Sequence, residues 1–459
     1  MSKQTRLRKN DIVPLTITGY TAQGSGVGHY DGMAVFVPKA AEGDCLQVRI
    51  LKVGKTYAYG KIESITVPSK DRVEPDCPQF TKCGGCVFRH ISYAAECRAK
   101  EQRVRDAIQR IAGLDPKLVG PIAAAPFSDR YRNKAQFPLG RDAEGKFTAG
   151  FYALHSHRIV PCKDCRLQPA VFAKAVCAVG EWQRESGESI YEERTGKGVL
   201  RHLYLREAMS SGTIMVCLVI NGNSVRREDR LVSLLRKQVP GLCSVILNRN
   251  SKNTNVILGK QFRLLWGTSF LVDTLCGLKF SISPQSFYQV NRDQAEVLYR
   301  IAKRFAGLTA KETLLDLYCG TGTIGLSMAD QAERLIGVEV VPAAVEDARK
   351  NAERNHIKNA EFRCGDAPQI AEQFQQQGLV PDVIVLDPPR KGCGPALVHT
   401  AASMMPSRIV YVSCDPATLA RDLKTFAGEG YFLRQAVPVD LFPRTAHVEC
   451  VALMSRVKK

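Results

Sequence analysis

The chain has 459 residues, with 64 lysines and arginines against 45 aspartates and glutamates, which gives a formal net charge of +19. The length predicts two to four domains, and 45% hydrophobic with 24% charged residues is typical of a soluble globular protein. The start, MSKQTRLRKN, has no apolar segment, and no apolar run approaches the ~20 residues of a membrane span. We therefore expect a cytoplasmic protein without membrane contact, whose basic surface favours a polyanion such as nucleic acid.

Residues 8–66 are predicted to form a small β-barrel. Short alternating segments (DIVPLTITGY, MAVFVPKA, DCLQVRILKV and YAYGKIESI) are separated by turn signals such as GSGVG and YDG. Their spacing fits a five-stranded OB-like barrel, a common RNA-binding shape. We assign residues 1–67 to this domain, and a polar connector, VPSKDRVEPDCP, links it to the rest of the chain.

Three of the sixteen cysteines stand close together after this connector, as C-x5-C-x2-C. They are Cys77, Cys83 and Cys86, with a Gly-Gly pair before the last one that permits a tight turn, and a later CKDC adds Cys162 and Cys165. In a reducing compartment, four such thiolates indicate an iron–sulfur cluster or a zinc ion rather than disulfides. Radical enzymes would show C-x3-C-x2-C, so we expect a metal that is structural or positions RNA.

Two further regions precede the last third of the chain. Residues 68–92 and 120–275 are rich in predicted hairpins and form the central domain that carries the cysteines. Residues 93–119 have helical periodicity and are expected to pack on the last domain. The apolar face of that helical segment comprises Ala95, Val104, Ala107, Ile108 and Ile111.

Residues 276–459 alternate short apolar strands with helix-length stretches, which is typical of an α/β domain with a doubly wound, mostly parallel sheet. Ligands of such sheets bind beyond the carboxyl ends of the strands. Each strand predicted here ends in a polar or reactive residue, which is unusual for a purely structural sheet. The marked positions are Asp316 to Gly320, Glu339, Asp366, Asp387, Cys414 and Asp440.

The sequence LDLYCGTGTIGL predicts a strand, a glycine-rich turn and a helix, the element that holds nucleotide-like cofactors. With Asp316 before it, this loop resembles the S-adenosylmethionine site of Rossmann-like methyltransferases, and the alternative is another nucleotide-binding fold. Glu339 ends the next strand, where it can accept hydrogen bonds from ribose hydroxyls. Asp366 either faces the adenine or is a solvated turn residue. Asp387 in DPPRKG is held at the sheet edge by two prolines, or simply ends its strand.

Cys414 follows a strand of β-branched and aromatic residues and precedes Pro416, which begins a helix. The dipole of that helix favours a thiolate, although a cysteine that ends an apolar strand is usually a core residue. The sequence DLFPRTAHVEC places His447 and Glu449 at the last strand, as reactive groups or as a structural and a surface side chain. The marked ends of the neighbouring strands favour a catalytic role for Cys414.

Five motifs together resemble the RNA (uracil-5-)-methyltransferase family: SPQSFYQVN at residues 283–291, LDLYCGTGTIGL, DPPRKG, YVSCDPATLARDL and DLFPRTAHVE. The N-terminal sequence GYTAQGSGVGHYDGMAVFVPKAAEGD is similar to a TRAM domain. The similarity extends over nearly the whole chain. It implies an OB-like TRAM barrel, a β-rich iron–sulfur domain, and a Rossmann-like methyltransferase domain that uses S-adenosylmethionine.

The resemblance also implies roles for individual residues. The implied cofactor contacts are Gln289, Tyr318, Glu339 and Asp387, with Asp366 at a position where family members vary. The implied nucleophile is Cys414, the general base is Glu449, and the RNA contacts are Arg132 and Lys134 in YRNKAQF. The implied ligands of a 4Fe–4S cluster are Cys77, Cys83, Cys86 and Cys165, whereas Cys162 falls where the family has an aliphatic residue.

This residue set suits one reaction. Carbon 5 of uracil attacks a methyl sulfonium poorly unless a thiolate first adds to carbon 6 and creates an enolate. A base must then remove the carbon-5 proton so that the thiol can leave. The target must also leave its base stack to enter the pocket.

Three hypotheses follow from these observations. The first is methylation of uridine to 5-methyluridine in 23S ribosomal RNA, which the N-terminal barrel favours because the bacterial transfer-RNA branch commonly lacks it. The second is the same reaction on transfer RNA. The third is a non-catalytic iron–sulfur protein that binds RNA. In each case we expect a monomer.

Overall fold

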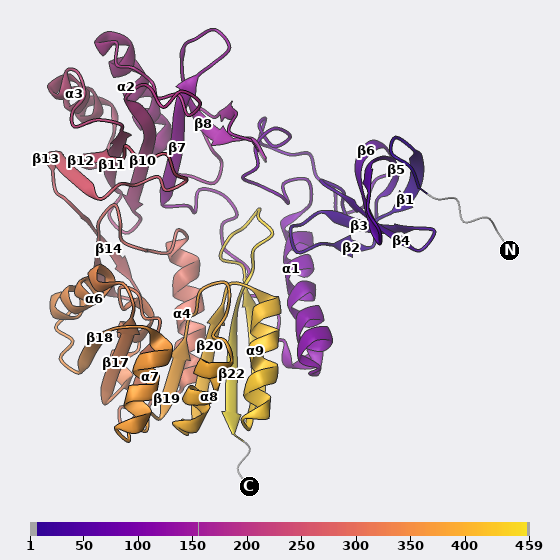
Figure 1. The fold of residues 1–459 in the computed structure, drawn as a ribbon, viewed down its shortest axis with the longest axis vertical. Coiled ribbons are helices and arrows are strands. Elements are labelled where there is room, and N and C mark those ends of the chain that lie inside the picture. Colours follow the sequence, from indigo (N-terminus) through magenta and orange to yellow (C-terminus); the bar gives the residue numbers. More distant parts are fainter. Residues whose placement is uncertain (1–6, 155, 457–459) are drawn as a thin grey trace.

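The computed structural model describes residues 7–154 and 156–456, which form three large sheets and one separate hairpin (Figure 1). In the view of Figure 1 the N-terminal barrel lies to one side, the central sheet lies above, and the doubly wound sheet lies below. Within the described residues, no helix is both long and apolar enough to cross a membrane.

The N-terminal barrel is a six-stranded sheet in the order β1-β5-β6-β4-β3-β2. Alternate side chains such as Val35, Val48 and Ile50 point inward and are fully buried. The sequence predicted five strands, and the difference is the two-residue strand β2, which is too short to show periodicity. The strands are β1 (Ile12–Thr16), β2 (Gly19–Tyr20), β3 (Gly26–Tyr30), β4 (Met33–Val37), β5 (Cys45–Val53) and β6 (Tyr57–Val67).

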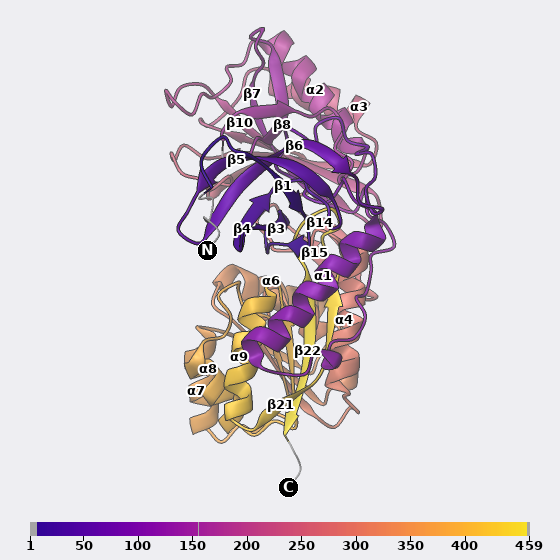
Figure 2. The same cartoon turned by 90° about the vertical axis from the view of Figure 1, so that its right-hand side faces the viewer.

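The helical segment after the connector packs on the C-terminal sheet, where it contacts strand β21 (Tyr431–Val439) and lies beside helix α9 (Pro416–Gly428) (Figure 2). It comprises α1 (Tyr93–Ala107), a π-helical turn (Ile108–Ala112) and, after Gly113 in the left-handed region, a short 3-10 turn (Pro116–Leu118). Four of the five predicted apolar positions are buried, but Ile111 is 40% exposed. The buried face also includes Glu96 and Lys100, which hydropathy alone excludes from a core.

The central domain is a seven-stranded sheet in the order β13-β12-β11-β10-β7-β8-β9, which two helices cover. Trp182 and Leu234 from these helices pack with Leu205 and Val216 of the sheet. The strands are β7 (Lys134–Arg141), β8 (Phe147–Tyr152), β9 (Ile159–Pro161), β10 (Leu200–Ala208), β11 (Thr213–Ile220), β12 (Leu242–Arg249) and β13 (Gln261–Gly267), and the helices are α2 (Val171–Ser186) and α3 (Glu228–Gln238).

The third domain has the doubly wound α/β architecture expected from the sequence, with seven strands in the order β18-β17-β16-β19-β20-β22-β21. Five of its strands are parallel neighbours, and β22 is antiparallel to both β20 and β21. The strands are β16 (Thr313–Leu317), β17 (Arg334–Glu339), β18 (Ala360–Cys364), β19 (Val383–Leu386), β20 (Arg408–Ser413), β21 (Tyr431–Val439) and β22 (Glu449–Arg456).

Helices cover both faces of this sheet, and two buried apolar clusters result. The hairpin β14–β15 joins it to the central domain. The remaining elements are β14 (Leu271–Leu275), β15 (Leu278–Ile282), α4 (Arg292–Ala306), α5 (Thr323–Leu326), a 3-10 turn (Ala329–Gln331), α6 (Pro342–Arg354), α7 (Ala367–Gln376), α8 (Pro395–Ser403) and α9 (Pro416–Gly428).

Candidate active site

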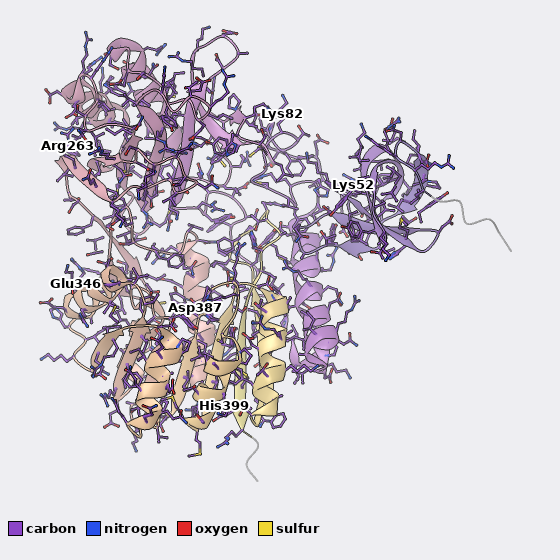
Figure 3. The ribbon with its side chains drawn as sticks, viewed as in Figure 1. Lys52, Lys82, Arg263, Glu346, Asp387 and His399 are labelled. Atoms are coloured by element: carbon purple, nitrogen blue, oxygen red, sulfur yellow. The ribbon has the colours of Figure 1, made fainter. Side chains whose placement is uncertain are left out.

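The carboxyl ends of the parallel strands border a cavity of about 1250 Å³. Asp387, labelled in Figure 3, lies at this edge of the sheet, on the side that faces the middle of the molecule. All seven residues predicted to bind the cofactor or to act in catalysis line the cavity. They are Gln289, Tyr318, Glu339, Asp366, Asp387, Cys414 and Glu449.

The glycine-rich loop after β16 is held by two carboxylates. Asp316 Oδ2 accepts a hydrogen bond from Gly325 N at 3.0 Å, and a Cβ at Gly325 would meet that oxygen at 2.7 Å. Glu339 accepts from Gly320 N at 3.2 Å and from Val341 N at 2.8 Å. Burial and the nearby charge of Asp387 raise the pKa of Asp316 to about 8. The loop therefore presents its backbone to the cavity in one fixed shape.

The DPPRKG turn after β19 is held from behind by helix α9. Asp422 Oδ2 accepts from Cys393 N at 2.9 Å and from the Tyr411 hydroxyl at 2.7 Å, and Arg421 donates to Lys391 O at 2.7 Å. Burial raises the pKa of Asp387 to about 7. The turn also brings Arg390 into the cavity, a residue that sequence reasoning did not single out.

Cys414 lies between β20 and α9, which begins at Pro416 as predicted. The helix dipole was predicted to favour the thiolate of Cys414, but in the structure the pKa of this thiol is raised. Asp415 caps the helix by accepting from Ala417 N at 2.9 Å and Thr418 N at 3.0 Å, so it occupies the free donors of the helix start. Burial and the charges of Glu449 and Asp387 raise the pKa of Cys414 to about 11, and Arg390 acts in the opposite direction.

Glu449 reaches the cavity because its strand runs against its neighbours. It is the first residue of antiparallel β22 and pairs with Val439, the last residue of β21, so it lies at the edge where the parallel strands end. The side chain is buried, and burial together with Asp387 raises its pKa to about 8, against the opposing effect of Arg390. His447 and Phe442, from the loop before β22, line the same cavity.

Gln289 is positioned by the YRNKAQF motif rather than by the sheet. Asn133, within that motif, donates from Nδ2 to Gln289 O at 2.9 Å and from its backbone N to Val290 O at 2.8 Å. The buried guanidinium of Arg206 also donates to Ser286 O in the same segment. Sequence reasoning missed Asn133, because its partner lies 156 positions away in the chain.

Arg132 and Lys134 line a different cavity, of about 270 Å³, together with the clustered cysteines. Burial and the neighbouring Arg206 and Arg132 lower the pKa of Lys134 to about 8. The cysteine residues that line this cavity are Cys77, Cys83, Cys86, Cys162 and Cys165. The structure thus brings together the two cysteine motifs that the sequence separates by more than seventy residues.

The cysteine cavity has the residues of a candidate metal centre. Across residues 7–154 and 156–456, no three His, Cys, Asp or Glu side chains are arranged to hold a single metal ion. An iron–sulfur cluster differs from a single metal ion in what it requires of its ligands, because each thiolate binds a different iron atom of the cluster. Arg89 and Arg166 line the cavity with Arg132 and Lys134, and these cations suit an anionic group bound by thiolates.

Asp440, the remaining marked strand end, does not line the active-site cavity. Its carboxylate is fully buried and binds Lys100 and Tyr93 of helix α1. The sequence predicts Asp440 to be one of the ligand-binding strand ends, because it directly follows a strand. The structure gives it a different environment, since β21 is the outermost strand and α1 covers its end.

Comparison with known proteins supports an assignment. Residues 244–457 match the family model "tRNA (Uracil-5-)-methyltransferase", and residues 6–62 match the TRAM domain. An uncharacterized RNA methyltransferase of Halalkalibacterium halodurans is 44% identical over 99% of both chains. One of Clostridium tetani is 42% identical over 99% of this chain and 98% of its own.

Among solved structures, the tRNA (uracil-54, C5)-methyltransferase of Pyrococcus abyssi, in complex with S-adenosyl-L-homocysteine, is 26% identical with a TM-score of 0.76. The match covers 96% of this chain and 100% of that one. The fold and the cavity are those of a Rossmann-like methyltransferase that uses S-adenosylmethionine. The chain belongs to the RNA (uracil-5-)-methyltransferase family, with an N-terminal TRAM domain.

Proposed function

We propose that this protein methylates carbon 5 of a uridine in 23S ribosomal RNA and produces 5-methyluridine. The observation that carries the proposal is that Cys414 and Glu449 line one cavity with the glycine-rich cofactor loop. A methyltransferase that acts on nitrogen has no need of a thiol, whereas carbon 5 of uracil must be activated by a nucleophile at carbon 6. The same arrangement argues against a purely RNA-binding protein.

The reaction begins at Cys414. The thiol first loses its proton to water, the thiolate Sγ then forms a bond to carbon 6 of the flipped uracil, and the electron pair of the carbon 5–carbon 6 double bond moves into an enolate. S-adenosylmethionine bound in this cavity would supply the methyl group that carbon 5 takes and would leave as S-adenosylhomocysteine. Glu449 removes the proton from carbon 5, the double bond re-forms, and the Sγ–carbon 6 bond breaks to release the thiolate.

The charge of Arg390 acts on both reactive groups of the cavity, Cys414 and Glu449. The positive charge of Arg390 favours the thiolate of Cys414 and opposes the rise in the pKa of Glu449. It can also stabilise the enolate oxygen. Glu339 is assigned to the cofactor ribose and Asp366 to its adenine, and Gln289, Tyr318 and Asp387 are assigned as further cofactor contacts.

Transfer RNA is the second candidate substrate, and a specific observation favours it. The Pyrococcus abyssi enzyme named for uracil 54 of transfer RNA matches 96% of this chain, so an N-terminal barrel does not separate the two substrates. Methylation of 23S ribosomal RNA and of transfer RNA transcripts, followed by mass mapping of the modified nucleotide, distinguishes the candidates. The proposal for ribosomal RNA fails if only transfer RNA gains 5-methyluridine.

The chemistry has its own test, which applies to either substrate. RNA with 5-fluorouridine accepts Sγ and the methyl group, but carbon 5 then carries fluorine in place of the removable proton. A stable protein–RNA adduct is therefore expected with wild-type protein and none with Cys414→Ala. A Cys414→Ala variant that methylates RNA at the wild-type rate would refute the mechanism.

We also propose that the cysteine cavity holds a 4Fe–4S cluster on Cys77, Cys83, Cys86 and Cys165. The convergence of these thiols with Arg89 and Arg166 in one cavity supports the assignment. Arg132 and Lys134 line this cavity, while Asn133 between them in the chain binds Gln289 O, and we keep the role in RNA contact for both cations. A bound cluster would cross-link residues 77–86 to 162–165, and it has no place in the methyl transfer itself.

The barrel offers a surface that suits unpaired RNA. The rings of Phe36, Tyr57 and Tyr59 stand on adjacent strands β4 and β6, with centroids 5.5–5.7 Å apart. Tyr57 is 41% and Tyr59 44% exposed, and Lys52 lies opposite Tyr59 on β5. Exposed rings next to lysines bind bases by stacking and phosphates by charge. We propose that this surface of the TRAM domain binds RNA outside the target nucleotide. We keep residues 1–67 as the limits of this domain.

A further inference from the structure

We propose that Lys100, Glu96 and Asp440 form a positioning network for the reaction, in which helix α1 fixes the loop that walls the target-base pocket. The loop comprises residues 440–448 and joins β21 to β22. The inference rests on the proposed function, and it concerns residues that lie outside the cavity and do not touch the substrate.

Lys100 uses every donor of its ammonium group in this network. Its Nζ lies 2.7 Å from Glu96 Oε1, 2.7 Å from Asp440 Oδ1 and 3.2 Å from Phe442 O. The three side chains of the network are at most 1% exposed. Two of the three acceptors therefore belong to the loop, and one belongs to the helix.

Two further contacts extend the network along the loop. Glu96 Oε1 also accepts from Arg444 N at 2.6 Å, and the Tyr93 hydroxyl donates to Asp440 Oδ2 at 2.8 Å. Helix α1 thus holds loop positions 440, 442 and 444 in succession. Arg444 has a φ of 69°, a left-handed conformation that a non-glycine residue adopts only when its surroundings impose it.

The loop is also held from the side of the cysteine motif. Arg444 O accepts from Val87 N at 2.7 Å and from Phe88 N at 3.2 Å, directly after Cys86. The Tyr131 hydroxyl donates to Pro443 O at 2.8 Å. The loop is therefore held by hydrogen bonds on two sides, from helix α1 and from the segments next to the cysteines.

Two side chains of the loop connect the network to the active-site cavity. Phe442 and His447 line the active-site cavity and contact each other edge to face, with ring centroids 6.1 Å apart. Glu449 follows directly, and its partner in the sheet, Val439, directly precedes Asp440. A shift of the loop would move both the wall of the pocket and the approach to the general base.

Energetic considerations favour positioning over stability as the role of these charges. Removing charged groups from water costs about as much as their attraction returns, and apolar residues of similar size often stabilise a fold equally well. Directed hydrogen bonds from a saturated ammonium fix a loop in one geometry, which apolar packing does less strictly.

The experiment measures turnover per competent active site. The fraction of competent protein is titrated as the adduct with a 5-fluorouridine transcript of 23S ribosomal RNA, and turnover is then measured on the ordinary transcript. The main variant combines Lys100→Met, Glu96→Gln and Asp440→Asn, which removes the buried ammonium and both carboxylates together; Arg444, whose side chain is 16% exposed, loses its 3.7 Å ion pair with Glu96. Tyr93→Phe, which removes the hydrogen bond to Asp440 and the acceptor of Ala125 N, is a second and milder variant.

We expect the triple variant to lose at least ten-fold in turnover per titrated site and Tyr93→Phe about three-fold. Amide hydrogen exchange in residues 440–448 should rise in both. Arg105→Met is the matched control, because Arg105 lies on the same helix and pairs with Glu101 and Pro116 O away from the loop. It should change neither quantity.

The outcomes separate this inference from the proposed function. If wild-type protein forms no adduct with either substrate class, the proposed function fails. If wild-type protein forms the adduct but both variants keep turnover per titrated site within two-fold of it, the positioning role is wrong. A purely structural role would lower the titrated fraction and leave turnover per site unchanged, which also overturns the inference.

Discussion

The backbone N–H of Gly320 donates a hydrogen bond to Glu339 Oε2 over 3.2 Å, so the carboxylate at the end of β17 holds the glycine-rich loop that follows β16. Its other oxygen accepts from Val341 N at 2.8 Å, just before α6. Each oxygen still has a lone pair free for a ribose hydroxyl. One side chain thus shapes the loop and faces the cavity where the cofactor is expected.

Glu339→Gln should weaken cofactor binding. The amide keeps the size of the side chain, but it replaces one acceptor with a donor that faces another N–H group. We expect the Kd for S-adenosylmethionine to rise at least ten-fold, about 1.4 kcal/mol, when measured by titration calorimetry. Glu346→Gln is the control, since Glu346 is exposed on α6, and it should leave the Kd unchanged. Equal affinities would contradict the assignment of Glu339.

The pH dependence of the reaction should report Glu449. A base accepts a proton only when it is ionised, and the pKa of Glu449 is raised to about 8 by burial and Asp387. We therefore expect an additional fall in kcat/KM as the pH drops below about 8, on top of the gradual dependence that ionisation of the Cys414 thiol, with its pKa raised to about 11, imposes over the whole range. Arg390→Ala removes the charge that favours the ionised form, so it should move this limb of the profile to higher pH. A profile that is flat between pH 6 and 9 would contradict the role of Glu449.

Glu449 should also make the protein less stable at alkaline pH. Its carboxyl has a higher pKa in the folded chain than its ordinary value of 4.5, so stability is greatest below that value and is lost as the pH rises towards about 8. Glu449→Gln removes the group whose ionisation destabilises the folded protein at alkaline pH. We expect it to be more stable than wild type at pH 9, by on the order of 2 kcal/mol, and equally stable at pH 4.5. Thermal unfolding at both pH values measures the difference, and a constant difference would contradict the explanation.

The aromatic surface of the barrel should contribute to RNA affinity. Stacking on an aromatic side chain is worth about 1–3 kcal/mol per base, so Tyr59→Ala should raise the Kd for single-stranded substrate RNA at least five-fold. Lys52→Ala should lower the dependence of binding on salt concentration. Ile65→Ala is a control on the same strand, because Ile65 is 40% exposed but lies outside the ring cluster. Filter binding at several salt concentrations measures all three.

The cysteine cavity should lose its iron when any of its four assigned ligands is removed. Cys83→Ser and Cys165→Ser are expected to abolish the visible absorbance and lower the iron content of protein purified without oxygen. Cys162→Ser tests the choice between the two cysteines of CKDC and should retain iron. Cys177→Ser is the control, since Cys177 is exposed on α2. Zinc in place of iron, or iron retained without Cys165, would correct the assignment.

The sequence predicted the active-site cavity well because local patterns determined it. Strand, turn and helix signals placed Tyr318, Glu339, Asp387 and Cys414 at strand ends, and a parallel sheet gathers such ends at one edge. The electrostatic environment of Cys414 was not predictable in the same way. The helix dipole suggested a thiolate, but the side chain of Asp415 takes the helix donors and burial raises the thiol pKa.

Other features depended on contacts between distant parts of the chain. Lys100 and Asp440 are 340 positions apart, and Asn133 and Gln289 are 156 apart, so no local period reveals either pair. The helix that carries Lys100 was predicted from its apolar positions, and these leave a buried lysine unexplained until its acceptors are known.

The sequence by itself determined the doubly wound sheet and which strand-end residues line one cavity, because each arises from periodicity or from a motif within about twenty residues. The tertiary structure decided what surrounds the reactive groups. It alone shows that Glu449 starts an antiparallel strand beside Cys414's strand, and that the loop before it is held by a buried lysine. Burial and charge at a site depend on groups that only folding brings together, and those quantities set the pKa values and the geometry on which catalysis depends.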